Sequence, residues 1–252
     1  MSAALERFAF SFGRVAELYD ASRPDYPPEA IDRAVAALGL TPDADVVDLA
    51  AGTGKLTRAL GVRFSRVIAV EPDDRMRGVL EATTPTAVTS AGTAERTQLP
   101  GASVDAVFVA DAFHWFAGEA ALQEIARILR PGGGLALLWN NWWKIEPPFP
   151  DAAREALEDV FPRTGRRELQ PGLEEWRRGF EGAPFEDLRT EQLEWELKLP
   201  AEHVVSLYLT PSAMAALPEG ERAELRKILE RELSGTYRLP IETGLYWTRL
   251  RL

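Results

Sequence analysis

Two acidic residues stand at the ends of short apolar segments in the first third of the chain. Asp48 is the next-to-last residue of the segment 45–49, ahead of a turn of small residues at 50–54, and Glu71 follows the segment 66–70, 23 residues after Asp48. A carboxylate at the end of a second parallel strand can accept hydrogen bonds from both hydroxyls of a ribose. Small residues let a ligand approach the backbone at a helix start. The spacing therefore predicts a site for an adenosine-type ligand.

The pair Gly54-Lys55 is also found in phosphate-binding loops. That loop needs a glycine five positions before its second glycine, where Leu49 stands, and a Ser or Thr after the lysine, where Leu56 stands. Two defining positions are wrong, which argues against a nucleoside triphosphatase.

A dinucleotide or S-adenosylmethionine could occupy the predicted site. The dinucleotide fingerprint needs a third glycine three residues after Gly54, and Thr57 stands there. Asp48 would also repel a pyrophosphate, whereas a ligand with an ammonium and a sulfonium group tolerates an acid. S-adenosylmethionine is favoured. A NAD-dependent oxidoreductase and a non-enzymatic S-adenosylmethionine-binding protein remain as alternatives.

Apolar segments alternate with amphipathic ones along the first 140 residues, which indicates a parallel sheet covered on both faces. We expect strands at 45–49, 66–70, 87–91, 104–110 and 135–139, with helices at 28–38, 56–60, 73–82 and 119–129 between them. Later segments predict helices at 151–160, 173–180, 202–209 and 219–233, and strands at 188–199 and 245–250. The fold class is α/β: a doubly wound, Rossmann-like, seven-stranded sheet with an antiparallel edge pair and a helical cap.

Composition limits the classes of partner. The 252 residues carry a formal net charge of −10, which disfavours nucleic acid, and they include no cysteine and two histidines, which disfavours a metal site. No apolar run reaches the roughly 20 residues that span a bilayer, and the start lacks the pattern of a signal peptide. We expect a cytoplasmic protein with no membrane partner.

Four blocks together resemble the class I S-adenosylmethionine-dependent methyltransferases. They are VVDLAAGTGKLT (46–57), VIAVEPD (67–73), GTAERTQLPGASVDAVFVADAFHWF (92–116) and EIARILRPGGGLALLWNN (124–141). With YDASRPDYP (19–27), the chain looks similar to the methyltransferase type 11 and trans-aconitate methyltransferase-like branch. That family usually has glycine where Ala50 stands. The resemblance implies one domain over 1–252, with a lid at 1–27, a cofactor-binding core at 28–145, and a cap plus edge strands at 146–252.

The resemblance also implies a site. Asp48 would lie near the methionine amino group, Glu71 would hold the ribose diol, and Glu95 would reach the adenine amine. The other expected cofactor contacts are Tyr19, Arg23, Ala50, Gly52, Thr53, Gly54, Pro72, Met76, Ala94, Asp111 and Ala112.

The expected acceptor is a small molecule, with a carboxylate favoured. Its contacts would be Tyr26, His114, Trp115, Asn140 and Trp142. A carboxylate needs no base, but a hydroxyl or carbon acid does, and His114 is then the candidate because imidazole titrates near neutral pH.

Overall fold

The computed structural model describes residues 16–141, 148–163 and 175–252. The chain forms two compact units, described here separately. The sheet unit comprises Asp25–Asn141, Gly172–Leu193 and Glu242–Leu252, and the helical unit comprises Met1–Pro24, Trp142–Pro171 and Glu194–Ile241.

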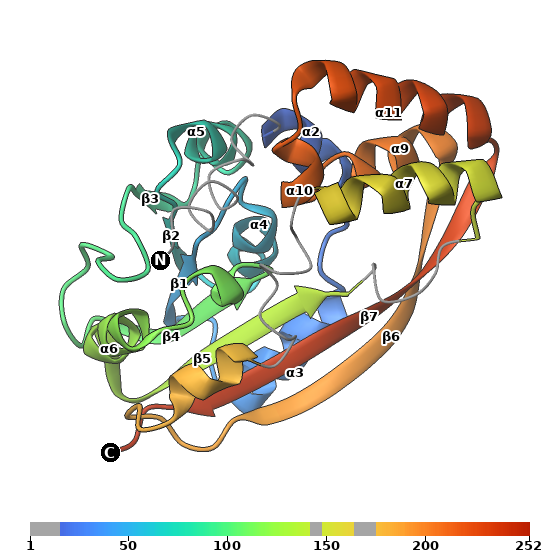
Figure 1. The fold of residues 1–252 in the computed structure, drawn as a ribbon. Helices are drawn as coiled ribbons and strands as arrows, with labels where there is room; N and C mark the ends of the chain where they lie inside the picture. Colours follow the sequence, from blue (N-terminus) through green and yellow to red (C-terminus); the bar gives the residue numbers. More distant parts are fainter. Residues whose placement is uncertain (1–15, 142–147, 164–174) are drawn as a thin grey trace. The chain divides into compact units, whose positions relative to one another are not determined.

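Seven strands make one sheet in the order β3-β2-β1-β4-β5-β7-β6 (Figure 1). Strands β1 to β5 pair in parallel, and β7 runs antiparallel to β5. The predicted doubly wound sheet with an antiparallel edge is confirmed. The strands are β1 (Asp45–Leu49), β2 (Arg66–Val70), β3 (Val88–Ser90), β4 (Val104–Ala110), β5 (Leu129–Asn140), β6 (Arg189–Pro200) and β7 (Thr236–Arg249).

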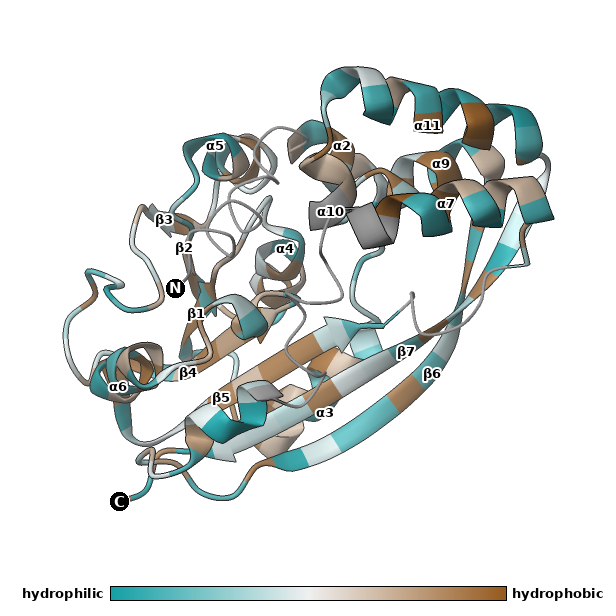
Figure 2. Ribbon diagram, in the orientation of Figure 1, coloured by the Kyte–Doolittle hydropathy of each residue, from teal (hydrophilic) through white to brown (hydrophobic). Residues whose placement is uncertain are grey.

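Alternate residues of the parallel strands face two separate cores. Val47 and Val107 belong to one core together with the apolar face of α6 (Glu119–Ile128). Val46 and Phe108 belong to the other, together with α3 (Pro28–Ala37) and α4 (Lys55–Gly61). Burial on both faces explains why these strands read as continuous apolar runs, which are brown in Figure 2.

Helix α5 (Asp74–Thr83) begins one residue after the predicted position. Asp73 is its N-cap, because the Asp73 side chain accepts hydrogen bonds from the backbone N–H groups of Arg75 and Met76. The cap fixes the direction of the chain just after Glu71.

Three elements differ from the sequence-based expectation in ways that bear on the sheet. Strand β5 begins at Leu129 and not at 135, since Leu129 already pairs with Val104. Residues 130–133 form a bulge between this pair and the pair Ala106–Gly134. Strand β7 begins nine residues before 245, although it contains a proline and a glycine that read as breakers. The expected helix at 173–180 is a 3₁₀ segment, η3 (Glu175–Phe180), and it belongs to the sheet unit.

The helical unit has its own apolar core. Leu157, Leu207 and Leu229 are almost completely buried there, with Leu18 packed against them. Its helices are α2 (Ala16–Ser22), α7 (Asp151–Arg163), α9 (Ala201–Tyr208), α10 (Ser212–Ala215) and α11 (Glu219–Glu232). In the described part of the chain, no helix is long and apolar enough to cross a bilayer.

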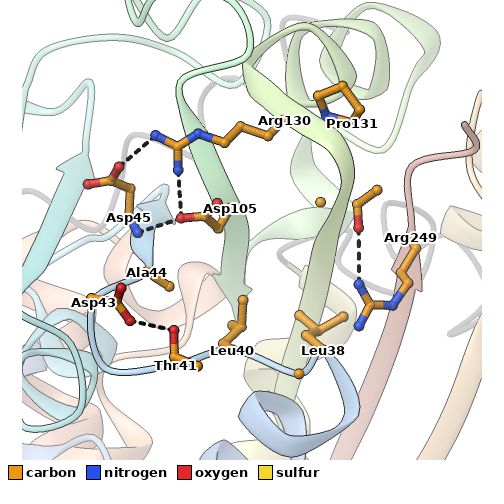
Figure 3. A pocket seen from close by; sticks show the side chains of 13 residues that line it. Leu38, Leu40, Thr41, Asp43, Ala44, Asp45, Asp105, Arg130, Pro131 and Arg249 are labelled. Atoms are coloured by element: carbon orange, nitrogen blue, oxygen red, sulfur yellow. Dashed lines mark hydrogen bonds and ion pairs between the residues drawn. The ribbon is translucent and has the colours of Figure 1, made fainter.

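A cavity of about 430 Å³ opens at the amino ends of the parallel strands, within the sheet unit (Figure 3). One wall is an ion-pair cluster in which the Arg130 guanidinium binds Asp45 at 2.7 Å and Asp105 at 2.6 Å. Arg66 also binds Asp45, at 3.0 Å. The hydrogen bond from Arg130 is the main reason that the pKa of Asp45 lies below its ordinary value. The cluster joins the amino ends of β1, β4 and β5, whereas Asp48 and Glu71 lie at the carboxyl ends of their strands.

Arg130→Ala is expected to lower the free energy of unfolding by about 1–2 kcal/mol, because two partly shielded carboxylates lose their shared cation. Arg66→Ala removes a more exposed partner of Asp45 and should cost less than about 0.5 kcal/mol. Urea unfolding of both variants measures this. Equal losses would show that Arg130 is not the central cation.

Candidate functional site

The turn after β1 brings the backbone into left-handed conformations at three alternate residues. Ala50 has φ 58°, Gly52 has φ 58° and Gly54 has φ 85°. A Cβ atom at Gly54 would lie 2.9 Å from the Cγ atom of Leu80, so this position needs glycine for space as well as for φ. A Cβ atom at Gly52 would lie 3.5 Å from the Met76 side chain. The turn therefore presents backbone, flanked by Met76.

Asp48 is a buried carboxylate at the end of β1, and it is 1% exposed. Its Oδ2 atom accepts a 2.6 Å hydrogen bond from the Thr57 hydroxyl. Its Oδ1 atom is buried and has no partner among the described residues. The pKa of Asp48 is raised to about 7, mainly by burial; the Thr57 hydrogen bond lowers it and the nearby Glu71 carboxylate contributes to the rise. A buried acceptor of this kind calls for a donor or a cation.

Glu71 lies at the end of the neighbouring strand β2 and is 7% exposed. Its two oxygen atoms accept 2.8 Å hydrogen bonds from the backbone N–H groups of Gly52 and Asp73. Burial raises the pKa of Glu71 to about 6, and these two bonds oppose that rise. A carboxylate has about four acceptor positions. Glu71 therefore ties the turn to α5 and keeps two positions for hydroxyl donors.

Asp111 follows β4 and also has a left-handed backbone, with φ 51°. Its Oδ2 atom accepts a 2.8 Å hydrogen bond from the Tyr26 hydroxyl, and its Oδ1 atom accepts one from the Asn140 backbone N–H at 3.1 Å. The Asn140 side chain, 1% exposed, donates to the Asp25 carbonyl and accepts from the Thr243 hydroxyl. Tyr26 and Asn140, expected near the acceptor, thus share a hydrogen-bonded network with Asp111.

His114 lies in the 3₁₀ turn η2 (Phe113–Trp115), three residues after Asp111. Its Nδ1 atom accepts a hydrogen bond from the indole N–H of Trp139 at 3.3 Å. The ring of Trp115 lies 4.7 Å away, between centroids. His114 is therefore held by an aromatic partner on β5 and lies after β4, whose neighbour β1 carries Asp48.

Comparisons with known proteins agree with this architecture. Residues 47–137 match a family described as a methyltransferase domain. An uncharacterized methyltransferase-like protein of Schizosaccharomyces pombe is 32% identical over 216 residues, which are 84% of this chain and 81% of the relative. The chain belongs to the class I S-adenosylmethionine-dependent methyltransferases.

Other methyltransferases match in part or in fold. An uncharacterized methyltransferase of Mycobacterium tuberculosis is 46% identical over 141 residues, and the chain spans only 56% of that relative's length. A structure provisionally described as a type II methyltransferase from Anaeromyxobacter dehalogenans superposes with a TM-score of 0.64 at 24% identity. The match covers 91% of this chain and 98% of that one. At this identity the likeness shows the shared fold.

The residues at the ends of β1 and β2 fit the methyl donor that defines this family. S-adenosylmethionine carries an ammonium and a sulfonium group, and the unpartnered Oδ1 atom of buried Asp48 is an acceptor that such a cation can satisfy. Glu71 retains acceptor positions for a ribose diol, and Ala50, Ala51 and Gly52 of the adjacent turn are half-buried. Thr53, 1% exposed with an unpartnered Oγ1 atom, adds a second buried polar group there.

The other predicted cofactor contacts lie in three places. Met76 is buried beside Gly52, whereas Pro72 and Ala112 are half-buried. Ala94 packs into the core on the α6 side of the sheet, and the adjacent Glu95 is exposed in a turn closed by Thr93 and Arg96. Tyr19 lies in α2 and Arg23 directly follows that helix, both in the helical unit, where the Arg23 guanidinium lies 5.0 Å from the centre of the Tyr19 ring. Trp142 and residues 1–15 of the expected lid lie outside the described residues.

Several residues that shape the site were not predicted from the sequence. The Thr57 hydroxyl donates a hydrogen bond to Asp48. The sequence could have predicted this contact, because Thr57 lies in the first turn of α4. Lys55, which suggested a phosphate loop, forms a 2.9 Å ion pair with Asp25. Trp139 donates a hydrogen bond to His114, and Thr243 donates one to Asn140. These contacts follow from the pairing of β5 with β4 and β7, which the sequence does not show.

Asp48→Asn should remove a pH dependence of stability. The folded pKa near 7 lies above the ordinary value of 3.8, so the stabilising contribution is complete below pH 3.8 and is lost as pH rises through 7. The variant keeps an acceptor for Thr57 and loses the charge. Its unfolding free energy should exceed that of the wild type by roughly 2–4 kcal/mol at pH 8 and by much less at pH 4.

Denaturant titrations at both pH values measure this effect. Glu81→Gln, on the exposed side of α5, is the matched control and should behave as the wild type does at both pH values. A constant difference between Asp48→Asn and the wild type would mean that Asp48 does not titrate in this range.

Ala50→Gly should stabilise the protein by about 0.5–1 kcal/mol, because an alanine at φ 58° is strained and glycine is not. The adjacent Ala51→Gly is the control. Since the φ of Ala51 lies outside the left-handed region, this change should cost about 0.5–1 kcal/mol. Thermal unfolding distinguishes the two, and a loss at both positions would show that Ala50 is not strained.

Proposed function

We propose that this protein transfers the methyl group of S-adenosylmethionine to a small-molecule acceptor, and we favour a carboxylate as the acceptor group. The observation that carries the proposal is the buried, unpartnered Oδ1 atom of Asp48 beside the glycine turn. A pyrophosphate at that position would be repelled by Asp48 and Glu71, which argues against a nicotinamide dinucleotide.

S-adenosylmethionine supplies a methyl group on a positively charged sulfur, which is already an activated leaving group. The residues of the chain therefore need to supply binding and orientation more than acid–base chemistry. Asp48 would pair with the ammonium group, and Glu71 would accept from the ribose hydroxyls. Tyr26 and Asn140 hold Asp111 in its left-handed conformation and so fix the chain where β4 ends.

A small acceptor is supported by charge and by precedent. The net charge of −10 opposes binding to a polyanion. Among the structural neighbours, a geranyl diphosphate methyltransferase in complex with S-adenosylmethionine has a TM-score of 0.53. That protein acts on a small molecule, and we propose the same size class here. The preference for a carboxylate rests on the chemistry, since a carboxylate attacks without losing a proton.

Glu71→Gln should weaken binding of S-adenosylhomocysteine by roughly 1.5–3 kcal/mol, the range for a hydrogen bond to a charged group. Glutamine keeps the size of the side chain and one of its two acceptor oxygens. Glu81→Gln serves as the control and should bind as the wild type does. Isothermal titration calorimetry gives the affinities, and an unchanged affinity in folded Glu71→Gln would remove Glu71 from the site.

Turnover is tested with a radiolabelled methyl donor and a panel of mono-, di- and tricarboxylic acids, with small alcohols and amines beside them. Label incorporated into an acid supports the proposal. Binding of S-adenosylhomocysteine without turnover on any small molecule, or labelling of RNA or protein instead, would contradict it.

A further inference from the structure

The hydrogen bond between Trp139 and His114 determines where the imidazole carries its proton. An indole N–H is a donor only, so the Nδ1 atom that it contacts at 3.3 Å must be an acceptor. A neutral imidazole has one donor and one acceptor nitrogen. The Nε2 atom of His114 therefore carries the proton and acts as a donor.

We propose that His114 serves as a hydrogen-bond donor to the methyl acceptor through its Nε2–H group, not as a general base, and that Trp139 is the positioning residue that fixes this arrangement. This inference rests on the proposed function. It differs from the role expected from the sequence, where His114 is the candidate base for hydroxyl and carbon acids. To take up a proton, the imidazole would have to use Nδ1, and the hydrogen bond from Trp139 would be lost.

Trp139 is held firmly enough to position another side chain. It is 7% exposed on β5. Its ring stacks on Trp176 with centroids 4.9 Å apart and meets the edge of Tyr246 at 5.5 Å. The next residue, Asn140, is fixed by the network around Asp111. The indole N–H therefore has a defined position within the sheet unit.

The backbone of His114 is fixed from the other side. Phe113, the preceding residue, is fully buried. Its ring contacts Phe116, Trp176 and Phe180 at centroid distances of 5.5 to 5.8 Å. Since both partners in the hydrogen bond are anchored to the same core, the imidazole ring has a set orientation as well as a set tautomer.

This arrangement limits the chemistry of the acceptor. An Nε2–H donor can orient an oxygen atom that already has a lone pair available. When a carboxylate oxygen attacks, the new O–CH₃ bond forms as the S–CH₃ bond breaks, the electron pair remains on sulfur, and no proton is released. A hydroxyl acceptor must lose a proton, and the protonated Nε2 atom cannot take it. The site thus suits acceptors that react without deprotonation.

The tautomer can be measured on the protein alone. The chain has only two histidines, and His203 is exposed in α9, so its ring reports the unconstrained tautomer mixture in the same spectrum. In two-bond ¹H–¹⁵N spectra of ¹⁵N-histidine-labelled protein above neutral pH, His114 should show an unprotonated Nδ1 and a protonated Nε2 atom. His203→Gln assigns the signals.

Matched tryptophan variants test the role of Trp139. Trp139→Phe should move the two His114 nitrogen shifts toward those of His203. Trp176→Phe removes an indole from the same cluster and leaves the bond to His114 in place, so the shifts should remain as in the wild type. A protonated Nδ1 atom in the wild type would overturn the inference, as would shifts in Trp139→Phe that match the wild type.

Two substitutions of His114 separate a donor from a base. A glutamine amide places an N–H near the position of Nε2 but cannot accept a proton. With the acid that gives most turnover in the panel, His114→Gln should retain kcat/KM within about fivefold, whereas His114→Ala should lose about 10- to 100-fold, as for one hydrogen bond to a charged group. A base would make both variants equally poor, by about 10²- to 10⁴-fold.

The outcomes distinguish the two proposals. Without turnover on any acid the proposed function fails, and the tautomer still decides whether His114 can be a donor. With turnover and equal losses in both His114 variants, the function stands and the donor role is wrong. Affinity for S-adenosylhomocysteine should be unchanged in His114→Gln, which confirms that the variant is folded.

Discussion

The burial of two carboxylates at the ends of adjacent strands is the constraint around which the sheet unit is arranged. Asp48 and Glu71 are both less than 10% exposed, and the Glu71 carboxylate raises the energetic cost of ionising Asp48. Backbone N–H groups and one hydroxyl offset that cost only partly. The remaining deficit, concentrated on one oxygen atom of Asp48, is what a cationic ligand can relieve. In the proposed function, stability in the absence of ligand and affinity for the methyl donor both depend on this pair of residues.

The left-handed residues follow from this constraint. For the Gly52 N–H to reach Glu71, the chain must turn sharply after Asp48, and the turn has positive φ angles at alternate residues. Two of these positions are glycines. The third is an alanine, so part of the strain stays in the native structure. Asp111 repeats the pattern after β4, where its carboxylate is bonded to Tyr26 and to the Asn140 backbone.

Local sequence predicted the parallel core well and the antiparallel edge less well. The bounds of β1, β2 and β4 agree with prediction because each is an apolar run closed by a polar or small residue. The length of strand β7 was underestimated because the nine residues before 245 contain Pro240 and Gly244; Gly244 pairs with Trp139 of β5 in spite of its local preference. In the site, Asp48 and Glu71 lie at strand ends as expected. The bond from Trp139 to His114 joins residues 25 positions apart on different elements, and spacing alone cannot predict it.

The network around Asn140 has a further consequence for how this fold can diversify. The Asn140 amide joins Asp25 to Thr243, and the Asn141 backbone N–H donates to Glu242. These residues lie at or next to three of the positions where the chain passes from one unit to the other. Insertions or exchanges in 142–171 or 194–241 can therefore accumulate without disturbing the geometry at Asp48 and Glu71.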